Sequence, residues 1–573
     1  MPDQRAYSSD AFNSLPFREQ LDALYGISAR DRRDLILSAP NAQRLVRSFA
    51  AESLFHTLKE IGLEDGAELL SLASGEQVCA LVDLDCWKKD RLETATLLNW
   101  LEVIVEAGGR AVGELLNSID RDLLVLLLRR FVRIHRREDP EEPEEDAEGP
   151  EVFELDEHYQ IFFHRPDARM PLVRSLIEAL YERDYSYFVT VMEEVWWGVD
   201  SDLEEAAFRL RNARLQDRGF PDYYEAQQIY RPLPAGDLAE REEPLGRPAI
   251  EDSGGLPQDR ALILPEDAAS FFSQVLNAGF SGEAASELRQ ELAYLVNRVL
   301  VAEGVDFADR ERVADTIRVA HDTVNLALES LSACDTTRAI HLLQHHYLQH
   351  LFRVAWDILL ELRKSAKRTV EGLGLESAAT AIEFLDTPYR EGLAGLLRMK
   401  PQFYEGIDRP GEIRYRPFAS LADLDRARTL LADVASLGEV CMRFLGQSPT
   451  QLTALRPAEA DDFRISAVLL TGFAHFALGR TVSIEPLGDD DLVALRAATR
   501  DPRTGRLRPE VRERFMAVNP GHVGFLEFSL RRFEDEFLTL SPDASVDPRF
   551  VTCLMIRTLR FAARSHPSPR RAS

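Results

Sequence analysis

Lysine, cysteine and long apolar runs are scarce in this chain of 573 residues. Only six of the 68 basic residues are lysines, and only five residues are cysteines, none of them in a C-x-x-C pair. So few cysteines exclude a disulfide-stabilised fold and a zinc knuckle, and we expect buried, reduced thiols. No apolar run reaches the roughly 18 residues of a membrane span, and residues 1–17 lack the order of a signal peptide. These absences predict a cytoplasmic protein.

Positive charge is also in deficit. The chain carries 96 acidic and 68 basic residues, which gives a formal net charge of −28. This balance argues against a dedicated nucleic-acid binder, because binding to phosphates needs a basic surface. Hydrophobic residues make up 45% of the chain and charged residues 29%, which is typical of a soluble globular protein.

The recognisable signatures of catalysis are missing as well. No lysine stands between a glycine and a serine or threonine, which excludes a P-loop, and Gly372-x-Gly374 lacks the third glycine of a dinucleotide-binding loop. Asp252-Ser253-Gly254-Gly255 resembles the nucleophile segment of chymotrypsin-like proteases. It stands, however, in a proline- and glycine-rich stretch of a helical protein, and a nucleophile needs an oriented base. We therefore predict no catalytic residue and no cofactor.

Amphipathic helix is what the chain has in abundance. Leucine and alanine recur at three- and four-residue spacing, with Ser, Asp, Gly or Pro at the stops, so we predict an all-α fold. A degenerate unit, formed by a helix end, a capping residue and a second helix, occurs at residues 44–58, 68–82, 114–128 and 178–192. Its irregular spacing excludes a strict solenoid and predicts an irregular, superhelical stack of helix pairs. Chance similarity among leucine-rich helices is the alternative.

One segment interrupts the helical pattern. Residues 138–151 contain nine acids, three prolines and no base. We interpret them as a solvated insertion, with an acidic docking tail as the alternative. Directly after it, Val152–Leu155 and Tyr159–Phe163 predict a small β-hairpin.

Prolines and glycines also mark the predicted domain boundary. Residues 231–260 are rich in both and predict a linker. It separates a helical-repeat domain, residues 1–230, from a second helical domain, residues 261–565. The last residues, 566–573, are predicted to form a basic, disordered tail.

A histidine cluster is the one candidate metal site. His341, His345, His346 and His350 lie on one predicted helix. At about 100° per residue they form two pairs on opposite flanks, so four ligands cannot meet at one ion. A pair four residues apart can bind zinc, and His346 and His350 share their polar side with Asp357. We interpret the four as boundary histidines that make hydrogen bonds, with a metal site or a proton-linked switch as alternatives.

Three further groups receive structural interpretations. Trp87 and the pair Trp196-Trp197 are expected to anchor the core. The arginines of the segment Arg414–Phe418 are expected to pair with the chain's own carboxylates rather than with an anion. A final helix, from about residue 548 to 564, is amphipathic and basic. We expect it to dock on the acidic body, with a partner or anionic lipid as the alternative.

Several short motifs resemble a bacterial family of large helical proteins of unknown function. The motifs are Leu15-Pro16-Phe17-Arg18-Glu19-Gln20, Lys59-Glu60-Ile61-Gly62, Trp87-Lys88-Lys89-Asp90-Arg91, Arg218-Gly219-Phe220-Pro221 and Tyr415-Arg416-Pro417-Phe418. The resemblance extends over nearly the whole chain and implies no activity and no site residues. Residues 44–130 are also similar to the helical repeat region of MgtE-type magnesium transporters. That similarity implies a superhelical shape only, because the membrane domain of those transporters is missing.

These observations favour a non-catalytic scaffold or regulatory module that binds another protein. Stacked helix pairs build grooves that hold helices or extended peptides, and the acidic balance favours a basic partner segment. We expect residues 1–230 to carry much of the binding. The alternatives are an enzyme with an unrecognised helical active site, dependent on the histidines and a metal, and a regulator that senses a nucleotide or a lipid.

Overall fold

The computed structural model describes most of the chain. The described residues are 7–25, 27–88, 90–137, 152–164, 169–238, 270–375, 377–409, 411, 414–455, 463–518, 521, 523–539 and 551–557. The acidic segment at 138–151, most of the predicted linker and the predicted tail at 566–573 lie outside them.

The chain divides into two compact units, Met1–Arg353 and Val354–Ser573. The described beginning of the predicted linker, residues 231–238, belongs to the first unit. It is attached there, because Leu233 N donates a hydrogen bond to Arg353 O (3.3 Å).

Helices form most of the regular structure, which confirms the predicted all-α class. The first unit contains α1 (Ser9–Asn13), α2 (Phe17–Tyr25), α3 (Ala29–Ser38), α4 (Ala42–Ser48), α5 (Ala51–Ile61), α6 (Ala67–Leu72), α7 (Gly75–Asp85), α8 (Thr94–Glu106), α9 (Gly109–Ser118), α10 (Arg121–Arg129), α11 (Met170–Arg183), α12 (Tyr185–Trp197), α13 (Asp200–Asp217), α14 (Tyr223–Gln227), α16 (Phe271–Gly279), α17 (Gly282–Glu303), α18 (Arg310–Ser332) and α19 (Thr336–His345). Helix α20 (Leu348–Gly372) begins in the first unit and ends in the second, which continues with α21 (Ala378–Phe384), α22 (Tyr389–Leu397), α23 (Leu421–Val440), α24 (Pro449–Ala454), α25 (Ile465–Ala477), α26 (Asp489–Thr499), α27 (Pro509–Val518) and α28 (Val523–Phe533).

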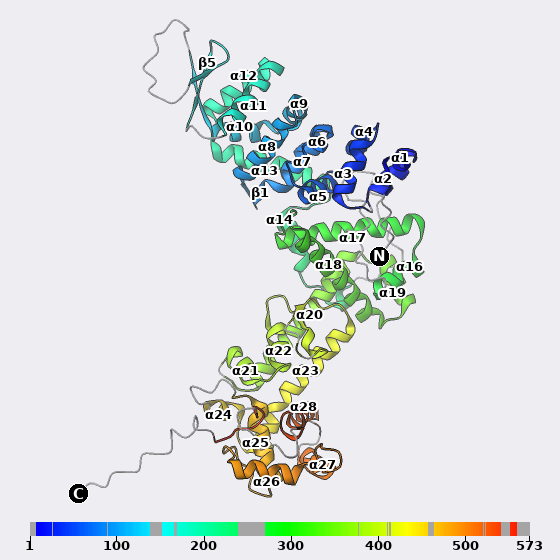
Figure 1. Cartoon of the computed structure of the whole chain (residues 1–573), viewed down its shortest axis with the longest axis vertical. Helices are drawn as coiled ribbons and strands as arrows, with labels where there is room; N and C mark the ends of the chain where they lie inside the picture. Colours follow the sequence, from blue (N-terminus) through cyan, green and yellow to red (C-terminus); the bar gives the residue numbers. More distant parts are fainter. Residues whose placement is uncertain are drawn as a thin grey trace, which may run out of the picture. The chain divides into compact units, whose positions relative to one another are not determined.

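The four repeat copies predicted from the sequence are helix pairs in the structure: α4–α5, α6–α7, α9–α10 and α11–α12. Capping residues separate the helices of a pair. Ser74 forms a capping box with Gln77, and Asp184 accepts a hydrogen bond from Tyr187 N (2.9 Å). The first helices form a row, in which α4 packs on α6, α6 on α9 and α9 on α11 (Figure 1). The last pair ends in α12, which packs on α10 and α11.

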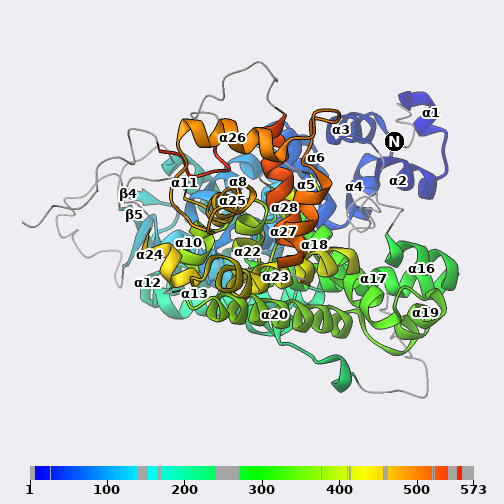
Figure 2. The same cartoon turned by 90° about the horizontal axis from the view of Figure 1, so that it is seen from below.

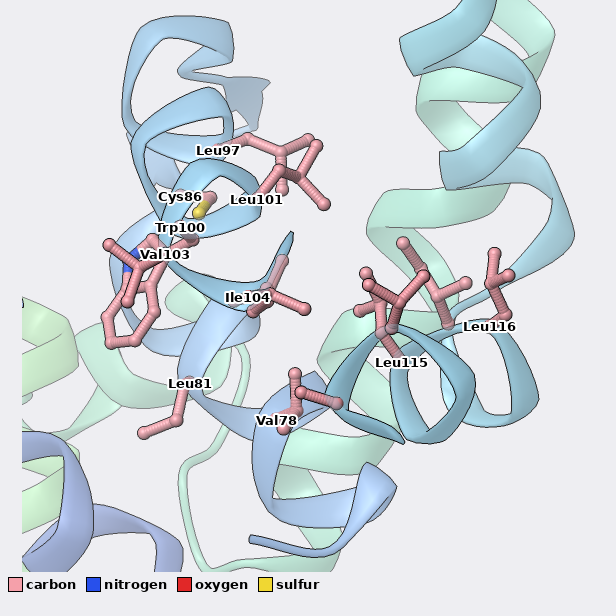
Figure 3. Close-up of a cluster of buried hydrophobic side chains, with 14 of the residues drawn as sticks. Val78, Leu81, Cys86, Leu97, Trp100, Leu101, Val103, Ile104, Leu115 and Leu116 are labelled. Carbon is pink, nitrogen blue, oxygen red and sulfur yellow. The ribbon is translucent and has the colours of Figure 1, made fainter. Parts of the chain in front are cut away.

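The core of the stack is filled from the facing sides of these helices. Helix α8 lies against α6, α7, α9 and α11 and buries Leu97, Leu101 and Ile104. Figure 3 shows part of this core, where side chains of α7, α8 and α9 meet. Trp100 is fully buried, and its one polar atom is satisfied because Nε1 donates to Asp85 Oδ2 (2.7 Å).

The predicted hairpin is present and gains a third strand. Strands β4 (Val152–Glu154) and β5 (Tyr159–Phe163) pair antiparallel, and β3 (Val132–Arg136) pairs with the other edge of β5, which gives the order β3-β5-β4. Two further ladders have two residues per strand, β1 (Trp87–Lys88) with β2 (Arg91–Leu92) and β6 (Phe403–Tyr404) with β7 (Tyr415–Arg416).

Helices α16 to α19 form a second group within the first unit. Helix α18 packs on α16, α17 and α19, and the four lie together in Figures 1 and 2. Asn325 of α18 is buried and joins two helices, because its Oδ1 accepts a hydrogen bond from Phe272 N (2.8 Å). The ring of Phe220 meets the ring of Phe307 edge-on at 5.1 Å and connects this group to the helix pairs.

In the second unit, Arg416 pairs with the chain's own carboxylates, as predicted. Its two terminal nitrogens donate to the two carboxylate oxygens of Asp423 at 2.7 and 2.8 Å, and its Nε lies 3.3 Å from Glu405. This arginine fixes the turn before α23, whose N-cap Ser420 accepts a hydrogen bond from Asp423 N.

We predicted a basic amphipathic helix from about residue 548 to 564. For the part of this segment that the structure describes, the prediction is wrong. Residues 551–557 are not helical. Leu487 N donates to Met555 O (2.9 Å), and Arg557 N donates to Leu487 O (2.8 Å), so the backbone pairs with a distant segment. Val551, Cys553, Leu554 and Ile556 are buried in this pairing. Tertiary contacts have replaced the helix that the local pattern favours.

Candidate protein-binding surface

Helix α12 ends the stack of helix pairs, and its inner side is an ordinary core face. Phe188, Val191, Met192 and Val195 are buried there. Their three- and four-residue spacing places them on one side of the helix, toward α10 and α11, on which α12 packs.

A second side of α12, about 120° around the helix from the core side, is partly exposed. Val189 and Glu193 are half-buried there, Val189 against the core, and strand β3 also packs on α12. We call this second side the α12 outer face and define it by Tyr185, Val189, Glu193, Trp196 and Trp197, which fall within an arc of about 120° at 100° per residue. Tyr185 is 47% exposed, Trp196 52% and Trp197 64%. The terminal unit of a repeat stack requires a polar outer face because it ends in water. This one presents three aromatic rings instead.

The core role predicted for Trp196 and Trp197 is therefore wrong, whereas Trp87 is buried as predicted. The chain turns sharply at Gly198, where an added Cβ would lie 2.5 Å from Glu194 O. Only glycine tolerates so close an approach without a shift of the backbone. The turn directs the chain at once into α13 and leaves both indole rings outside the contact between α12 and α10.

Arg129 of α10 fixes the end of α12 that carries the indole rings. Its Nη1 donates to Val195 O, and its Nε donates to Asp200 Oδ1 (2.6 Å). The first bond satisfies a carbonyl at the helix C-terminus and places a cation at the negative end of the helix dipole. The tryptophan pair consequently stands on a rigid helix end.

Tyr185 is fixed at the other end of the face. Its ring stacks on Phe188 (6.2 Å between centroids) and meets Tyr181 edge-on (5.7 Å). Its hydroxyl donates to Asp156 Oδ2 (3.2 Å), in the loop between β4 and β5. Desolvation and the Asp156 carboxylate raise the pKa of Tyr185, so it remains a neutral phenol.

Charged groups border the α12 outer face. Glu193, within the face, accepts a hydrogen bond from Tyr159 Oη (2.7 Å) and lies 3.6 Å from Arg136. Near Tyr185, Asp156, Glu157 and Asp184 form no ion pair in the described part of the chain. The face thus has carboxylates beside Tyr185 and arginines beside Glu193 and Val195.

A polar pocket of about 320 Å³ opens beside the start of α12. It is lined by Leu116, Asn117, Leu180, Arg183, Asp184 and Tyr187. Arg183 lies against Gly113, where an added Cβ would be 2.7 Å from Nη1, and its Nε donates to Asn117 Oδ1 (3.1 Å). The volume is at the lower end for small-molecule sites, about 300 Å³. A single polar side chain of a partner fits such a space.

The histidine cluster differs from its prediction. Helix α19 ends at His345 and α20 begins at Leu348, so the single predicted helix is broken. The ring of the exposed His341 stacks on that of His345 at 3.9 Å, and His345 Nδ1 lies 2.8 Å from His341 O. His346 is buried in the break, and the ring of His350 in α20 contacts that of Tyr347. Leu342 O accepts the His346 amide, which ends α19 and lets the chain change direction.

Within the described ranges, no three or more His, Cys, Asp or Glu side chains are grouped as metal ligands would be. Asp357 lies half-buried on α20. His345 makes the hydrogen bond expected of a boundary histidine; the same role for the other three stays a prediction.

The thiols are not arranged for chemistry in the described structure. Cys79, Cys86, Cys441 and Cys553 are buried, as predicted, but Cys334 is exposed. Burial raises the pKa of both Cys79 and Cys441 to about 12, so these thiols stay protonated.

A buried charge cluster beside Cys79 has a structural geometry. Arg214 of α13 donates from Nε and Nη2 to both oxygens of Asp83 in α7 (2.7 and 2.8 Å) and from Nη1 to Asp120 (2.7 Å). The bidentate pair joins α7 and α13 with the cap of α10.

The α12 outer face was missed at the sequence level because apolar residues cover most of the circumference of α12, with Ser186, Thr190, Glu193 and Glu194 on one polar arc of about 100°. Trp196 lies beside the apolar arc, so the pattern favours burial of its ring. The available signal was position: α12 belongs to the last copy of the repeat, so no further pair follows to cover it.

A family model described as a family of unknown function (DUF6178) matches residues 9–557. No curated protein and no solved structure matches. The similarity to MgtE-type repeats is not shown. In the described parts of the chain, no helix has both the length and the apolar character needed to cross a membrane.

Proposed function

This chain belongs to the family of unknown function DUF6178, and we propose that it is a cytoplasmic, non-catalytic module that holds another protein on the α12 outer face. The observation that carries the proposal is the pair of half-exposed tryptophans, Trp196 and Trp197, at the open end of the helix stack.

Exposed tryptophan at a fixed position is characteristic of protein interfaces. Trp and Tyr are enriched among the few residues that contribute most binding energy, and contiguous exposed apolar patches mark interaction sites. Because Arg129 and Gly198 fix the end of α12, the indole rings lose little entropy when a partner covers them.

The acidic balance of the chain supports a basic partner. A formal net charge of −28 attracts cationic surfaces over about a Debye length, roughly 10 Å at 0.1 M salt. The carboxylates beside Tyr185 add a local preference of the same sign at that end of the face.

Capture from an extract of the source organism tests the proposal. The full chain carrying Trp196→Ala and Trp197→Ala is compared with wild type at low salt. Tyr223→Ala with Tyr224→Ala is the matched control, because these adjacent aromatics are 52% and 81% exposed on α14 in the same unit.

We expect wild type and the tyrosine variant to capture the same protein, and the tryptophan variant to lose it. Capture that is equal for all three chains, or no specific capture at all, would contradict the proposal.

A further inference from the structure

The polar pocket beside the start of α12 has the charges and the size of an amino-acid site. We infer that it binds a free α-amino acid with a polar side chain, whose carboxylate is held by Arg183 and whose ammonium group is held by Asp184. None of the residues that line the pocket belongs to the α12 outer face, so the inference does not rest on the proposed function.

The pocket lies at a junction between helix pairs that is closed elsewhere in the stack. Between the first and second copies of the repeat, Gln77 of α7 is buried, and its Nε2 donates to Val46 O and Phe49 O at the end of α4 (2.8 Å each). In the register of the copies, Tyr187 of α12 takes the place of Gln77, and Leu116 of α9 that of Val46. Both line the pocket. A junction that an amide side chain closes in the first copies is thus left open between the third and the fourth.

Arg183 supplies a fixed cation on the α9 side of the pocket. Its Nε donates to Asn117 Oδ1 (3.1 Å), and an added Cβ at Gly113 would lie 2.7 Å from its Nη1. The guanidinium forms no ion pair in the described part of the chain. Its remaining N–H groups can therefore hold the carboxylate of a ligand in the bidentate geometry that arginine favours.

Asp184 supplies an anion on the α12 side. It is the N-cap of α12, where its Oδ1 accepts a hydrogen bond from Tyr187 N (2.9 Å), and among the described residues its carboxylate forms no ion pair. Arg183 and Asp184 are neighbours in sequence but do not pair, since the first is bonded to α9 and the second caps α12. Both side chains are exposed, so a ligand can reach both charges from solvent.

Two separate charges of opposite sign favour a zwitterion over a simple ion. A lone anion would be attracted by Arg183 and repelled by Asp184, and a lone cation would meet the reverse. The α12 side is acidic beyond Asp184 as well. Burial raises the pKa of Tyr187, Arg121 opposes this effect, and the Glu194 carboxylate adds to it.

The size of the pocket and its neutral groups select the class of zwitterion. A volume of about 320 Å³ is small for a ligand site, so the two charges of the ligand must lie close together, as they do in a free α-amino acid. Asn117 Nδ2 and the Tyr187 hydroxyl have no hydrogen-bond partner within the described ranges. Both groups are available to a polar side chain of the ligand.

Isothermal titration calorimetry with the full-length protein tests the inference. The probes are L-serine, L-threonine, L-asparagine and L-glutamine at millimolar concentration. Any probe that binds is compared with its amide, which lacks the carboxylate, and with its N-acetyl derivative, which lacks the ammonium group. We expect at least one amino acid to bind wild type, and both of its derivatives to bind at least about tenfold more weakly, because each loses a charge-assisted interaction.

Two substitutions isolate the charges of the pocket. Arg183→Met keeps a long side chain, and Asp184→Asn keeps a residue that caps helices as well as aspartate does. Each should weaken binding of the amino acid at least about tenfold. Arg174→Met on α11 and Asp490→Asn on α26 remove exposed charges from residues that do not line the pocket, and they should leave the affinity unchanged.

Other results assign the pocket differently. Failure of all four amino acids to bind, equal binding of the derivatives, or equal losses in the pocket variants and the control variants would each overturn the inference. If no amino acid binds and Arg183→Met abolishes capture of the partner protein, the pocket belongs to the protein interface instead. If no amino acid binds and capture is unchanged, this inference fails and the proposed function stands.

Discussion

Glu52 is a buried carboxylate whose two oxygens have no hydrogen-bond partner in the described structure. Arg218 Nη1 lies 3.5 Å from its Oε1, close enough for attraction but without hydrogen-bond geometry. Burial, which outweighs this arginine, raises the pKa of Glu52 above its ordinary value of 4.5. The residue therefore opposes folding wherever the unfolded chain would ionise it.

The first prediction concerns the pH dependence of Glu52→Gln. The folded chain holds the glutamate proton more tightly than the unfolded chain, so wild type loses stability as the pH rises above about 4.5, whereas glutamine does not titrate. The free energy of unfolding of the variant should therefore gain on that of wild type between pH 5 and pH 8. Urea unfolding at several pH values measures the difference; parallel curves, or a gain at low pH, would refute the argument.

The Asp83–Arg214 pair predicts a large effect of a single truncation. Arg214→Ala leaves Asp83 buried without its partner, and breaking a buried pair in this way costs about 3–5 kcal/mol. Arg209→Ala on the same helix is the control. Its partner Glu205 is exposed, and such pairs contribute about 0–1 kcal/mol. Thermal unfolding compares the two; similar losses for both variants would show that the buried pair has no special role.

The histidines give a prediction about metal. Since His345 is held by His341 O, the double variant His341→Gln, His345→Gln should leave metal content unchanged. Its stability should shift by about 1 kcal/mol, as polar changes at a boundary commonly do. Elemental analysis of the purified chain decides this point. Stoichiometric zinc that disappears in the double variant would revive the enzyme alternative.

At the scale of elements, the two sides of α12 should affect different properties of the protein. The inner side should affect the stability of the fold, and the outer face the binding of a partner. Phe188→Ala removes a fully buried ring from the inner side and should cost about 3–5 kcal/mol. Trp196→Ala with Trp197→Ala changes exposed rings and should cost about 1 kcal/mol or less. Urea unfolding of the full chain measures both, and a large loss in the tryptophan variant would mean that these rings support the fold.

Elements encoded by local pattern were predictable from the sequence. The helix pairs follow from apolar periodicity and caps such as Ser74, and the hairpin of β4 and β5 follows from two apolar runs around a short turn. Strand β3 was missed because it joins β5 across the long acidic segment. The two-residue ladders are too short to show alternation.

The candidate surface could not be predicted in the same way. The sequence shows that α12 is apolar over most of its circumference, but which part of that surface is left open depends on where the stack ends. The prediction of a final helix was wrong for a related reason. The backbone around Met555 forms hydrogen bonds with Leu487, which is distant in the sequence, and no local pattern reveals this pairing.

At the scale of the whole molecule, charge sets the conditions for binding. With a net charge of −28, association with a basic partner should weaken as salt screens the attraction, whose range falls from about 10 Å at 0.1 M to about 3 Å at 1 M. Calorimetry or surface binding of the captured partner across this range measures the trend. Affinity that is independent of salt would assign binding to apolar contact alone.

The most direct measurement places a photoreactive phenylalanine analogue at position 196 of the full chain in living cells, with position 224, which is more exposed to solvent, as the control. Ultraviolet irradiation should yield a covalent adduct with one specific protein from position 196 and none with that protein from position 224. Adducts with that protein from both positions, or from neither, would contradict the claim that the α12 outer face holds a partner.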